Sequence, residues 1–402
     1  MHLLVVGHTA HYERDGRTVG WWPTVREICW LAKAFDRVTH LACLHRGPAP
    51  ESALPYDTDK VRLELVPPAG GLGVKDKARV LTMGPRYVQA IRACLRQADV
   101  VQIRCPGPLG MYGMLVASRW RGIKWAKYAG SWAVASAMAS SHRFQRNWLN
   151  SGAFGGPVTV NGQWPGQPDH VHAFDNPSLT LPEVVQARAS VRAKRLDGPI
   201  RLVFVGRTAA SKGLDVALRV VKRLAQEIHL TFDVYGDGPE RPQFEDLGHQ
   251  LGLDGVVRFH GWVVHERVCA ALSGAHMILL PSQSEGWPKV LSEAMAYGVV
   301  PISSRVSAIP QVLAEIGSGV ALDQADVSAY VLAIREIVAA PDQWREMMRA
   351  GLRAAPRFTY ERYLMRLDEM LAAVYGEPCL DAGVMAELRA RWAAGLAIGG
   401  EA

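Results

Sequence analysis

Two charged pairs in the second half of the chain have the residue types and the spacing needed to recognise a phosphorylated ligand. The first pair, Arg207 and Lys212, lies in the segment 206–213, which follows an apolar run and opens a helical pattern. Gly206 lets the backbone turn close to a ligand at the end of a strand. An arginine fork and a lysine point charge above one crevice suit a diphosphate, although a plain turn with two solvated cations would have the same sequence.

The second pair, Glu285 and Glu293, is separated by seven residues. Pro288 suits the first turn of a helix, where its missing N–H would be unpaired in any case. The free N–H groups around Lys289 and Val290 would then form an anion site. Glu285 precedes this helix and Glu293 lies about two turns inside it. Two carboxylates at different depths can bind two sets of hydroxyl groups, whereas two exposed helix acids would not explain the Gly-Trp-Pro insert.

Alternating apolar runs and helical patterns supply the elements that position these pairs. In the second half, we predict strands at residues 201–205, 230–235, 256–259, 277–280, 299–303 and 320–322, and an almost entirely helical region from residue 326. In the first half, we predict strands at 3–6, 38–44, 61–66, 100–103 and 124–128, and helices at 25–34 and 79–97. This alternation predicts an α/β fold with two Rossmann-like lobes around parallel sheets.

A segment rich in glycine and proline, residues 152–182, has the composition of loops and hinges. We place the domain boundary just after it and predict a bridging helix at 181–194. The predicted domains are residues 1–180 and 181–375, followed by a C-terminal helical segment, 376–402.

The composition sets outer limits on the function. The chain has 402 residues, of which 49% are hydrophobic and 21% are charged, which excludes a disordered tail, a fibrous repeat or a membrane channel. It contains no uncharged apolar run of 18 residues, and its first seven residues resemble a buried strand rather than a signal peptide. Six scattered cysteines lack zinc spacing. We therefore expect a cytoplasmic protein with free thiols and no metal.

Positive charge is concentrated in the first half. Residues 1–180 hold 21 Lys/Arg against 12 Asp/Glu, and residues 77–150 hold 12 basic residues and one acid, Asp99. Four tryptophans interleave with six of these cations: Trp120, Trp125, Trp132 and Trp148 with Arg119, Arg121, Lys124, Lys127, Arg143 and Arg146. Amphipathic aromatics beside cations favour a membrane interface. We expect an anionic membrane surface or a phosphorylated acceptor rather than nucleic acid; an ordinary solvated basic face is the alternative.

Residues 200–325 resemble, in order and spacing, retaining GT-B glycosyltransferases of family 4. Glu285 and Glu293 are similar to the E-x7-E signature of that family, and the segment 206–213 is similar to its phosphate motif. Further similar segments lie at 235–239, 259–263, 281–282 and 298–301. In residues 1–180 the resemblance is limited to the opening strand and a turn at Gly20.

The resemblance implies a role for each matching residue. Arg207 and Lys212 would neutralise the donor diphosphate, and Glu285 would bind the transferred sugar. Glu293 would bind the ribose of the donor, and Val263 would meet its base. Gly20 and Gly206 would allow the diphosphate to approach closely. Further donor contacts would come from the backbone of Gly286, Trp287, Pro288, Lys289 and Val290. Fixed cations aimed at the leaving phosphate make a metal unnecessary. The nucleotide sugar is then a substrate, with UDP slightly favoured over GDP, and no cofactor is implied.

The family fold also implies an arrangement of the domains. Two Rossmann-like domains face a central cleft, with the acceptor on the first and the donor on the second. A C-terminal helix crosses back onto the first domain, and residues 360–375 or 384–397 fit that role.

Two features depart from or compete with this resemblance. Relatives often carry a histidine after the strand at 124–128, where this chain has Ser131; Ser131 is therefore an acceptor-side candidate, together with His8 in the first loop. Asp57 and Asp59 match the D-x-D metal motif of GT-A glycosyltransferases, but they do not follow an apolar strand. We interpret them as part of a solvated loop.

The sequence thus predicts a metal-independent, retaining glycosyltransferase that uses a nucleotide sugar and a hydroxyl acceptor. The predicted acceptor is lipid-linked, as in bacterial polysaccharide or glycoconjugate assembly at the inner face of the membrane. A soluble acceptor, a nucleotide-sugar 2-epimerase of the same fold and a non-catalytic binder remain alternatives. The epimerase would need acid/base residues that the motif positions lack, and the intact charged pairs argue against a mere binder.

Overall fold

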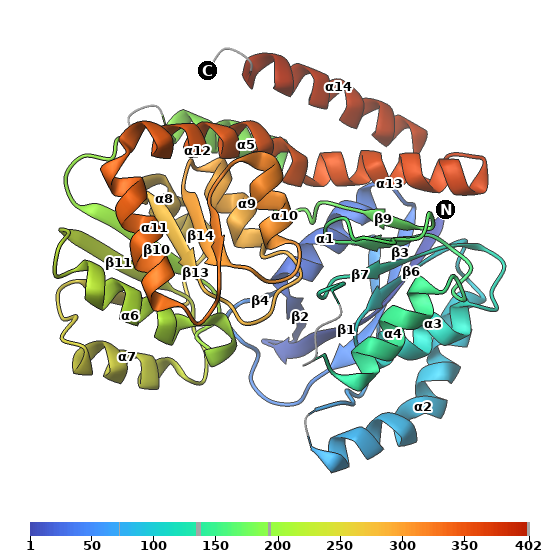
Figure 1. Cartoon of the computed structure of the whole chain (residues 1–402). Helices are drawn as coiled ribbons and strands as arrows, with labels where there is room; N and C mark the ends of the chain where they lie inside the picture. The colour runs from blue at the N-terminus through green and yellow to red at the C-terminus, as the bar shows by residue number, and fades with distance from the viewer. Residues whose placement is uncertain (72, 134–137, 192–193, 400–402) are drawn as a thin grey trace. The chain divides into compact units, whose positions relative to one another are not determined.

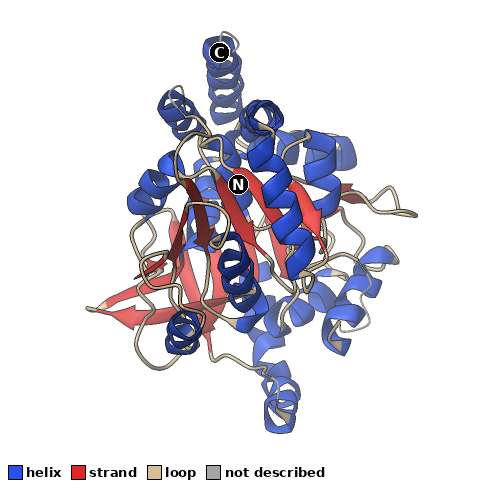
Figure 2. Ribbon diagram, turned by 60° about the vertical axis from the view of Figure 1, so that its left-hand side comes forward, coloured by secondary structure: helices blue, strands red, loops and turns tan. Residues whose placement is uncertain are grey.

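The computed structural model describes residues 1–71, 73–133, 138–191 and 194–399 (Figure 1). The chain divides into two compact units. The first contains Met1–Phe174 and Tyr360–Ala397, and the second contains Asp175–Thr359. Both are α/β units built around a mainly parallel sheet, as the alternating pattern predicts. Helices lie on both sides of the strands (Figure 2).

The second unit has a six-stranded parallel sheet among its described residues, in the order β12-β11-β10-β13-β14-β15. Its strands are β10 (Ile200–Val205), β11 (Leu230–Tyr235), β12 (Val257–Gly261), β13 (Met277–Leu280), β14 (Val300–Ser304) and β15 (Val320–Leu322). All four residues of β13 are buried, because helices cover both faces of such a sheet. The predicted strands of this unit are confirmed to within one residue, apart from the end of β12.

Helices fill the connections of the second unit. They are α5 (Leu181–Val191), α6 (Leu214–Leu224), α7 (Arg241–Gln250), α8 (His265–Gly274), α9 (Lys289–Ala296), α10 (Ile309–Ile316), α11 (Val327–Ala339) and α12 (Pro341–Ala354), with short 3-10 turns at Ala210–Lys212 and Ala355–Phe358. In α6, Leu214, Leu218 and Val221 recur at helical spacing and are buried. The predicted helix at 181–194 ends at Val191, and residues 192–193 of it lie outside the described residues.

The first unit has a nine-stranded sheet in its described part. The strands are β1 (His2–Arg14), β2 (Arg17–Trp21), β3 (Arg37–Leu44), β4 (Ala53–Leu54), β5 (Val61–Val66), β6 (Val100–Cys105), β7 (Ile123–Tyr128), β8 (Val158–Val160) and β9 (Val171–Ala173). Parallel pairing gives the order β5-β3-β1-β6-β7-β8-β9, while β2 and β4 pair antiparallel beside the end of β1. The prediction of loop over 152–182 is wrong for β8 and β9.

A hairpin replaces the expected short first loop. β1 continues to Arg14, turns through Asp15 and Gly16, and returns as β2 with Arg14 opposite Arg17. Asp15 and Gly16 both have positive φ (52° and 71°), which is the type I′ turn that Asp-Gly favours. Gly20 therefore lies within a strand, and the prediction of a turn at Gly20 is wrong.

The helices of the first unit are α1 (Trp22–Lys33), α2 (Val74–Leu95), α3 (Pro108–Ala117), α4 (Ser140–Asn150), α13 (Tyr360–Tyr375) and α14 (Ala382–Gly399). Successive residues of β1 face opposite sides: Leu4 and Val6 pack in the core with α2 and α3, and Leu3 and Val5 pack with α1, α13 and α14. None of the described helices is both long enough and apolar enough to cross a membrane.

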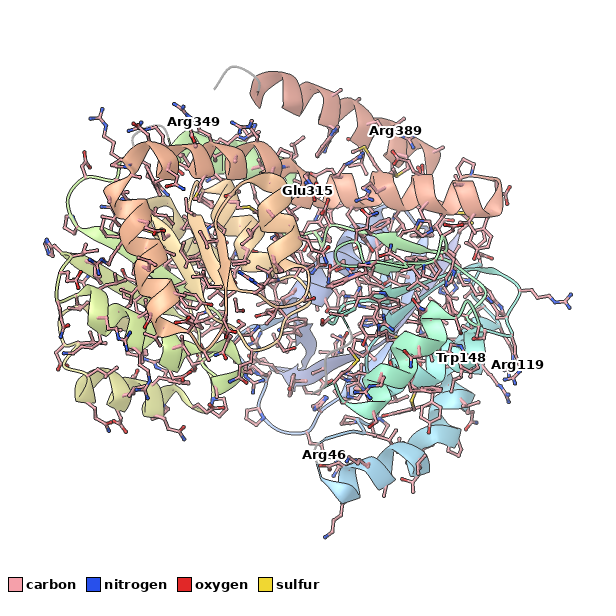
Figure 3. The ribbon with its side chains drawn as sticks, in the orientation of Figure 1. Arg46, Arg119, Trp148, Glu315, Arg349 and Arg389 are labelled. Atoms are coloured by element: carbon pink, nitrogen blue, oxygen red, sulfur yellow. The ribbon has the colours of Figure 1, made fainter. Side chains whose placement is uncertain are left out.

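The C-terminal helices belong to the first unit. Gln102 Nε2 of β6 donates to Tyr363 OH of α13, and Asp381 N, just before α14, donates to Ala34 O over 3.1 Å. Arg389 in α14 donates to Asp368 in α13 over 2.7 Å, and the two helices lie together (Figures 1 and 3). Residues 360–375 were predicted to belong to the second domain, whereas their contacts group them with the first unit.

Candidate functional site

The two charged loops meet where the strand order of the second sheet reverses. The chain passes from β10 to β11 and β12 on one side and then returns to β13 on the other. Lys212 follows β10 and Glu285 follows β13, and Lys212 Nζ donates to Glu285 Oε1 over 2.5 Å. Gln283 N also donates to Ser211 O over 2.9 Å. Open α/β sheets bind ligands outside the carboxyl ends of the strands at such a reversal.

Two glycines allow the loops of this sheet edge to lie so close together. Gly213 has a φ of +69°, and a Cβ there would lie 1.9 Å from Pro281 O. Gly236, after β11, has a φ of +129°, and a Cβ there would lie 1.9 Å from Gly206 O. A side chain at either position would force the loops apart.

Backbone hydrogen bonds fix the loop after β10. Thr208 N donates to Asp237 O over 3.1 Å. Ala210 N donates to Glu240 Oε2 over 2.8 Å. The Arg207 side chain is exposed on this fixed loop. One turn therefore presents an exposed guanidinium and the ammonium of the ion pair, which is the cation set predicted from the sequence.

Trp287 anchors the loop after β13. Its side chain is 5% exposed, and Nε1 donates to Ser292 Oγ over 2.7 Å. Its ring stacks on Phe358 with 5.3 Å between centroids. The indole is committed to packing, so only the backbone of Trp287 is available to a ligand. This packing is compatible with the backbone contact that the resemblance implies for Trp287.

Helix α9 begins one residue later than predicted. Pro288 is its N-cap, with ψ at 115°, and the helix starts at Lys289, so the placement of Pro288 in the first turn is wrong. Leu291 N donates to Pro288 O over 3.0 Å. Lys289 and Val290 lie in the first turn of this helix, where backbone N–H groups point out of the helix end. Glu293 lies half-buried in the same helix.

The loop after β12 carries Val263, which is half-buried. Gly236 N donates to Gly261 O over 2.7 Å and ties this loop to the end of β11. Beside it, Tyr235 and His260 stack with 4.3 Å between centroids. Both residues lie in segments that resemble the family, although no role was predicted for either side chain.

Two hydroxyl groups at this sheet edge were missed by sequence reasoning. Thr208 and Ser282 are fully buried, and neither Thr208 Oγ1 nor Ser282 Oγ has a hydrogen-bond partner among the described residues. Buried polar groups without a partner are uncommon in folded proteins. Each directly follows a residue the sequence analysis singled out, Arg207 and Pro281, and this adjacency is the signal that could have identified them.

The two acceptor-side candidates, His8 and Ser131, lie in the first unit, as does Gly20, the candidate for close approach of the donor diphosphate. His8 lies in β1 with Nδ1 3.3 Å from Cys43 Sγ, and burial lowers its pKa to about 4, with a smaller contribution from His45. Its imidazole is therefore neutral at pH 7. Gly20 packs so tightly in β2 that a Cβ would lie 2.6 Å from His11 Nε2. Ser131 is half-buried after β7, next to the undescribed residues 134–137.

Asp57 and Asp59 lie exposed between β4 and β5. The described ranges of the chain hold no group of three or more His, Cys, Asp or Glu side chains placed to bind a metal ion. The D-x-D segment thus forms no such group with other described acids.

The predicted aromatic and basic surface is wrong for four of its members. Trp125, Trp132, Lys124 and Lys127 are all buried. Lys127 Nζ and Arg104 Nη1 each donate to Glu27 Oε1 over 2.7 Å. Burial lowers the pKa of Lys127 to about 8, against the opposing effect of Glu27. Three of the four, Lys124, Trp125 and Lys127, belong to strand β7. The mixture of tryptophan and lysine in the sequence did not reveal that this strand lies in the core.

Comparison with known proteins places family similarity on the second unit. Residues 187–353 match the model of a family described as glycosyl transferases group 1. The D-inositol 3-phosphate glycosyltransferase of Xylanimonas cellulosilytica is 29% identical over 184 residues, 44% of this chain and 43% of that protein. The putative colanic acid biosynthesis glycosyltransferase WcaL of Salmonella typhimurium is 31% identical over 145 residues, 34% of this chain and 36% of that protein. The chain thus spans less than half the length of these curated relatives.

Similarity of structure extends over nearly the whole chain. Sucrose-phosphate synthase from Thermosynechococcus elongatus has a TM-score of 0.69 at 18% identity, covering 94% of this chain and 99% of that one. Anabaena HepE in complex with UDP and glucose has a TM-score of 0.63 at 13% identity, covering 92% and 99%. At these identities the likeness shows the fold, which is GT-B with two Rossmann-like domains.

Proposed function

We propose that the chain is a retaining glycosyltransferase that moves a sugar from a nucleotide-sugar donor to a hydroxyl group. The observation that carries this proposal is the Lys212–Glu285 pair at the strand-order reversal, inside the segment that matches the glycosyl transferase family model. The resemblance of Glu285 and Glu293 to the E-x7-E signature supports the same activity. Retention of configuration rests on that resemblance.

The charges on the loop after β10 suit departure of a nucleoside diphosphate. As the glycosidic bond breaks, negative charge grows on the β-phosphate and the sugar becomes oxocarbenium-like. Arg207 and Lys212, fixed on one turn, would stabilise this growing charge without reorganisation. We therefore propose metal-independent catalysis and no cofactor.

Glu285 has two functions in this proposal. In the free protein it holds Lys212 in place through the ion pair. With donor bound, it would accept hydrogen bonds from hydroxyl groups of the transferred sugar. Glu293, in the helix α9 that follows this loop, would bind the ribose. Val263 would meet the base, and the backbone of Gly286–Val290 would meet the sugar and phosphate.

The donor is proposed to be a UDP-sugar. Anabaena HepE was solved with UDP and glucose, and the pneumococcal O-GlcNAc transferase GtfA with UDP and GlcNAc. Both share this fold, which supports UDP ahead of GDP. The base contacts themselves come largely from backbone.

The acceptor is proposed to be a lipid-linked or otherwise phosphorylated sugar bound to the first unit. The WcaL relatives are described as colanic acid biosynthesis glycosyltransferases, which supports a role in polysaccharide assembly. The excess of basic residues in the first 180 residues supports an anionic acceptor at the inner face of a membrane. His8 and Ser131 remain the acceptor-side candidates, and Gly20 remains the candidate for close approach of the donor diphosphate. This implies a cytoplasmic protein that associates peripherally with the membrane.

A labelled donor separates the proposal from its alternatives. Transfer to an acceptor, or slow donor hydrolysis, supports a glycosyltransferase; an epimerised donor supports a 2-epimerase; binding alone supports a non-catalytic binder. Activity should persist in excess chelator and in Asp57→Ala. Loss in chelator that manganese restores, together with an inactive Asp57→Ala variant, would instead support the D-x-D alternative. A ligand at 100 times its Kd adds about 2.7 kcal/mol to stability, so thermal melts with UDP, GDP and dTDP identify the base.

A further inference from the structure

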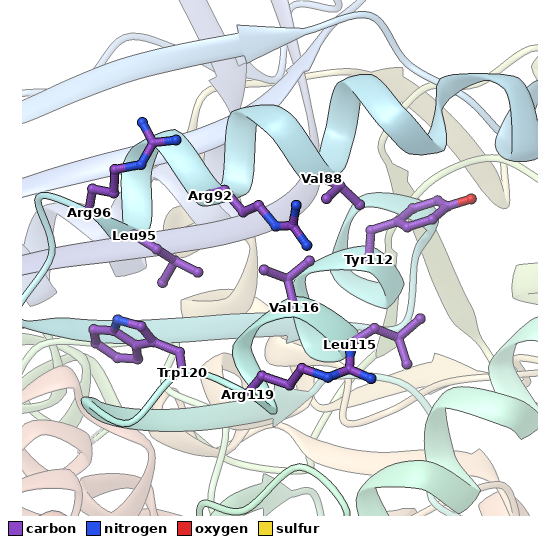
Figure 4. A pocket seen from close by; sticks show the side chains of 9 residues that line it. All are labelled: Val88, Arg92, Leu95, Arg96, Tyr112, Leu115, Val116, Arg119 and Trp120. Carbon is purple, nitrogen blue, oxygen red and sulfur yellow. The ribbon is translucent and has the colours of Figure 1, made fainter.

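The first unit carries a groove between α2 and α3 that the proposed transfer reaction does not use. Its volume is about 580 Å³, within the range of roughly 300–1,000 Å³ typical of small-molecule sites. It is lined by Val88, Arg92, Leu95, Arg96, Tyr112, Leu115, Val116, Arg119 and Trp120 (Figure 4).

The groove combines apolar walls with cations. Val88 and Leu95 from α2 face Leu115 and Val116 from α3 (Figure 4). Arg92 and Arg96 on α2 and Arg119 just after α3 all line the groove, with Arg92 and Arg119 on opposite sides of it (Figure 4). All three arginine side chains are exposed. An amphiphile with one apolar chain and an anionic head has the shape and charge that this lining complements.

Few acids oppose these cations locally. α2, α3 and residues 118–121 together contain one acidic residue, Asp76. Asp76 lies in the first turn of α2 and accepts from Gly73 N. At 1.5 Å rise per residue, it is about 24 Å along the helix from Arg92. Two acids lie nearby on other segments, and both have partners: Asp99 accepts from His2 N over 2.7 Å, and Glu64 pairs with Arg62 over 2.8 Å. The lining itself carries three arginines and no acid, so its charge is positive.

Hydrogen bonds to residues outside the lining hold the walls of the groove in place. Tyr112 OH donates to Val80 O over 3.1 Å, which joins α3 to α2. The buried Lys124 Nζ donates to the carbonyl oxygens of Ala117 and Trp120 over 2.9 and 2.8 Å. These bonds fix the end of α3 from which Arg119 and Trp120 project. Because the walls are preformed, a ligand would lose little affinity to ordering them.

An apolar stripe continues along α2 beyond the groove. Leu81, Val88 and Leu95 are spaced by seven residues and share one face of the helix. Leu81 is 73% exposed. Phe144 of α4, in the same unit, is also exposed. Exposed apolar side chains beside cations suit the headgroup region of an anionic bilayer.

We propose that this groove binds an anionic phospholipid of a membrane, with an acyl chain between α2 and α3 and the phosphate between Arg92 and Arg119. Guanidinium groups pair with phosphate oxygens in a two-pronged manner. The site replaces the tryptophan-based surface that the sequence suggested, because two of those tryptophans are buried. It goes beyond glycosyl transfer and does not require it: the groove and the donor loops lie in different units of the chain.

Vesicle sedimentation of the full chain tests the proposal. Vesicles of phosphatidylcholine are compared with vesicles containing 30% phosphatidylglycerol, at low and high salt. We expect retention on the anionic vesicles alone, weakened by salt. At about fivefold per basic residue, Arg92→Gln with Arg119→Gln should weaken binding about 25-fold. Arg349→Gln, an exposed cation of α12 (Figure 3), is the matched control and should bind like the parent protein.

A second variant separates a groove from a merely charged surface. Val116→Trp fills the groove without changing charge and should weaken vesicle binding at least tenfold while thermal melting shows a folded protein. Unchanged binding in Val116→Trp, with weakened binding in the arginine variant, would overturn the groove and leave surface electrostatics. Inorganic phosphate is also added as a competitor. If it displaces the protein from anionic vesicles at low concentration, the groove is a site for free phosphate, and the phospholipid proposal is overturned. Donor hydrolysis measured without vesicles reports on the proposed enzyme activity independently.

Discussion

Lys212 and Glu285 form an ion pair that joins the loops after β10 and β13 of the second unit. The lysine side chain is 28% exposed and the glutamate 9%, so the carboxylate is the more deeply placed partner. The pair holds an ammonium in position beside the exposed Arg207. Such a cation needs little rearrangement when a diphosphate binds, because its carboxylate partner already fixes it.

Arg207→Ala should reduce turnover about 100-fold or more, because removing one preorganised transition-state group costs about 3–4 kcal/mol. The side chain is exposed, so folding should be unaffected. Initial rates with a labelled nucleotide sugar and a thermal melt measure the two effects. Arg349→Ala, also exposed but on α12, should keep the parent rate. Near-parent turnover in Arg207→Ala would remove its diphosphate role.

Lys212→Ala should lower both turnover and stability, since it leaves the Glu285 carboxylate without its cation. An unpaired buried polar group costs about 1–3 kcal/mol or more if charged. Combining Lys212→Met with Glu285→Gln removes both charges and should recover stability, measured by urea unfolding, while turnover stays low. Recovery of turnover in the double variant would show that the pair is structural only.

The sequence was most informative in the second unit, because strands of a covered parallel sheet are continuous apolar runs. The segments at 230–235, 277–280 and 320–322 coincide with β11, β13 and β15 at both ends. The contact between the two charged loops was only implied, since it depends on which strands are neighbours. The order β11-β10-β13 cannot be read from local periodicity.

The first unit was less predictable, because its differences from the prediction depend on tertiary contacts and not on local sequence patterns. Short strands such as β8, with three residues, are too brief to show a period in a glycine-rich segment. Strand β7 contains two lysines and so has the composition of a surface strand. Trp125 and Lys127 of this strand are nevertheless buried, since the sheet is covered on both faces. The Asp15-Gly16 turn is an exception, because Asp-Gly between apolar runs is a local hairpin signal that could have predicted the β1–β2 hairpin.

Acidification should destabilise the first unit through its buried histidines. His11 is fully buried with Nε2 3.0 Å from Tyr56 OH, and burial lowers its pKa to about 4. Between pH 6.5 and 4 the unfolded chain binds a proton that the folded protein does not. The free energy of unfolding should therefore fall as pH decreases through this window, by up to about 1.4 kcal/mol per pH unit for this residue, and stay level in this respect above pH 7.

Urea unfolding at pH 7.5, 6 and 5 measures this dependence. His11→Gln should show a smaller loss between pH 6 and 5 than the parent protein. His249→Gln changes an exposed histidine of α7 and serves as the control. A parent stability that stays constant down to pH 5 would contradict the neutral buried state of His11.

Trp287→Ala should destabilise the second unit by about 3–5 kcal/mol, the usual cost of emptying a buried tryptophan site. It removes the stacking on Phe358 and the bond to Ser292 Oγ, and so frees the loop before α9. Trp287→Phe keeps a ring at the same position and should cost less. If the indole instead contacts the donor directly, Trp287→Phe will lose UDP affinity although it remains folded, as isothermal titration with UDP would show.

Gly213→Ala tests whether the close approach of the two loops matters for donor binding. Alanine there must adopt a φ of +69° and place its Cβ 1.9 Å from Pro281 O, so the loop after β10 must move away from the loop after β13.

The matched control is Gly317→Ala: Gly317 has a φ of +72° and no atom within 4 Å of a Cβ. It costs only the left-handed backbone conformation, about 1–2 kcal/mol. We expect Gly213→Ala to lose more stability than the control and to weaken UDP binding at least tenfold, because separated loops cannot hold Lys212 against Glu285. Equal UDP affinity in the two variants would show that the donor site tolerates separated loops and that the ion pair does not position the cation.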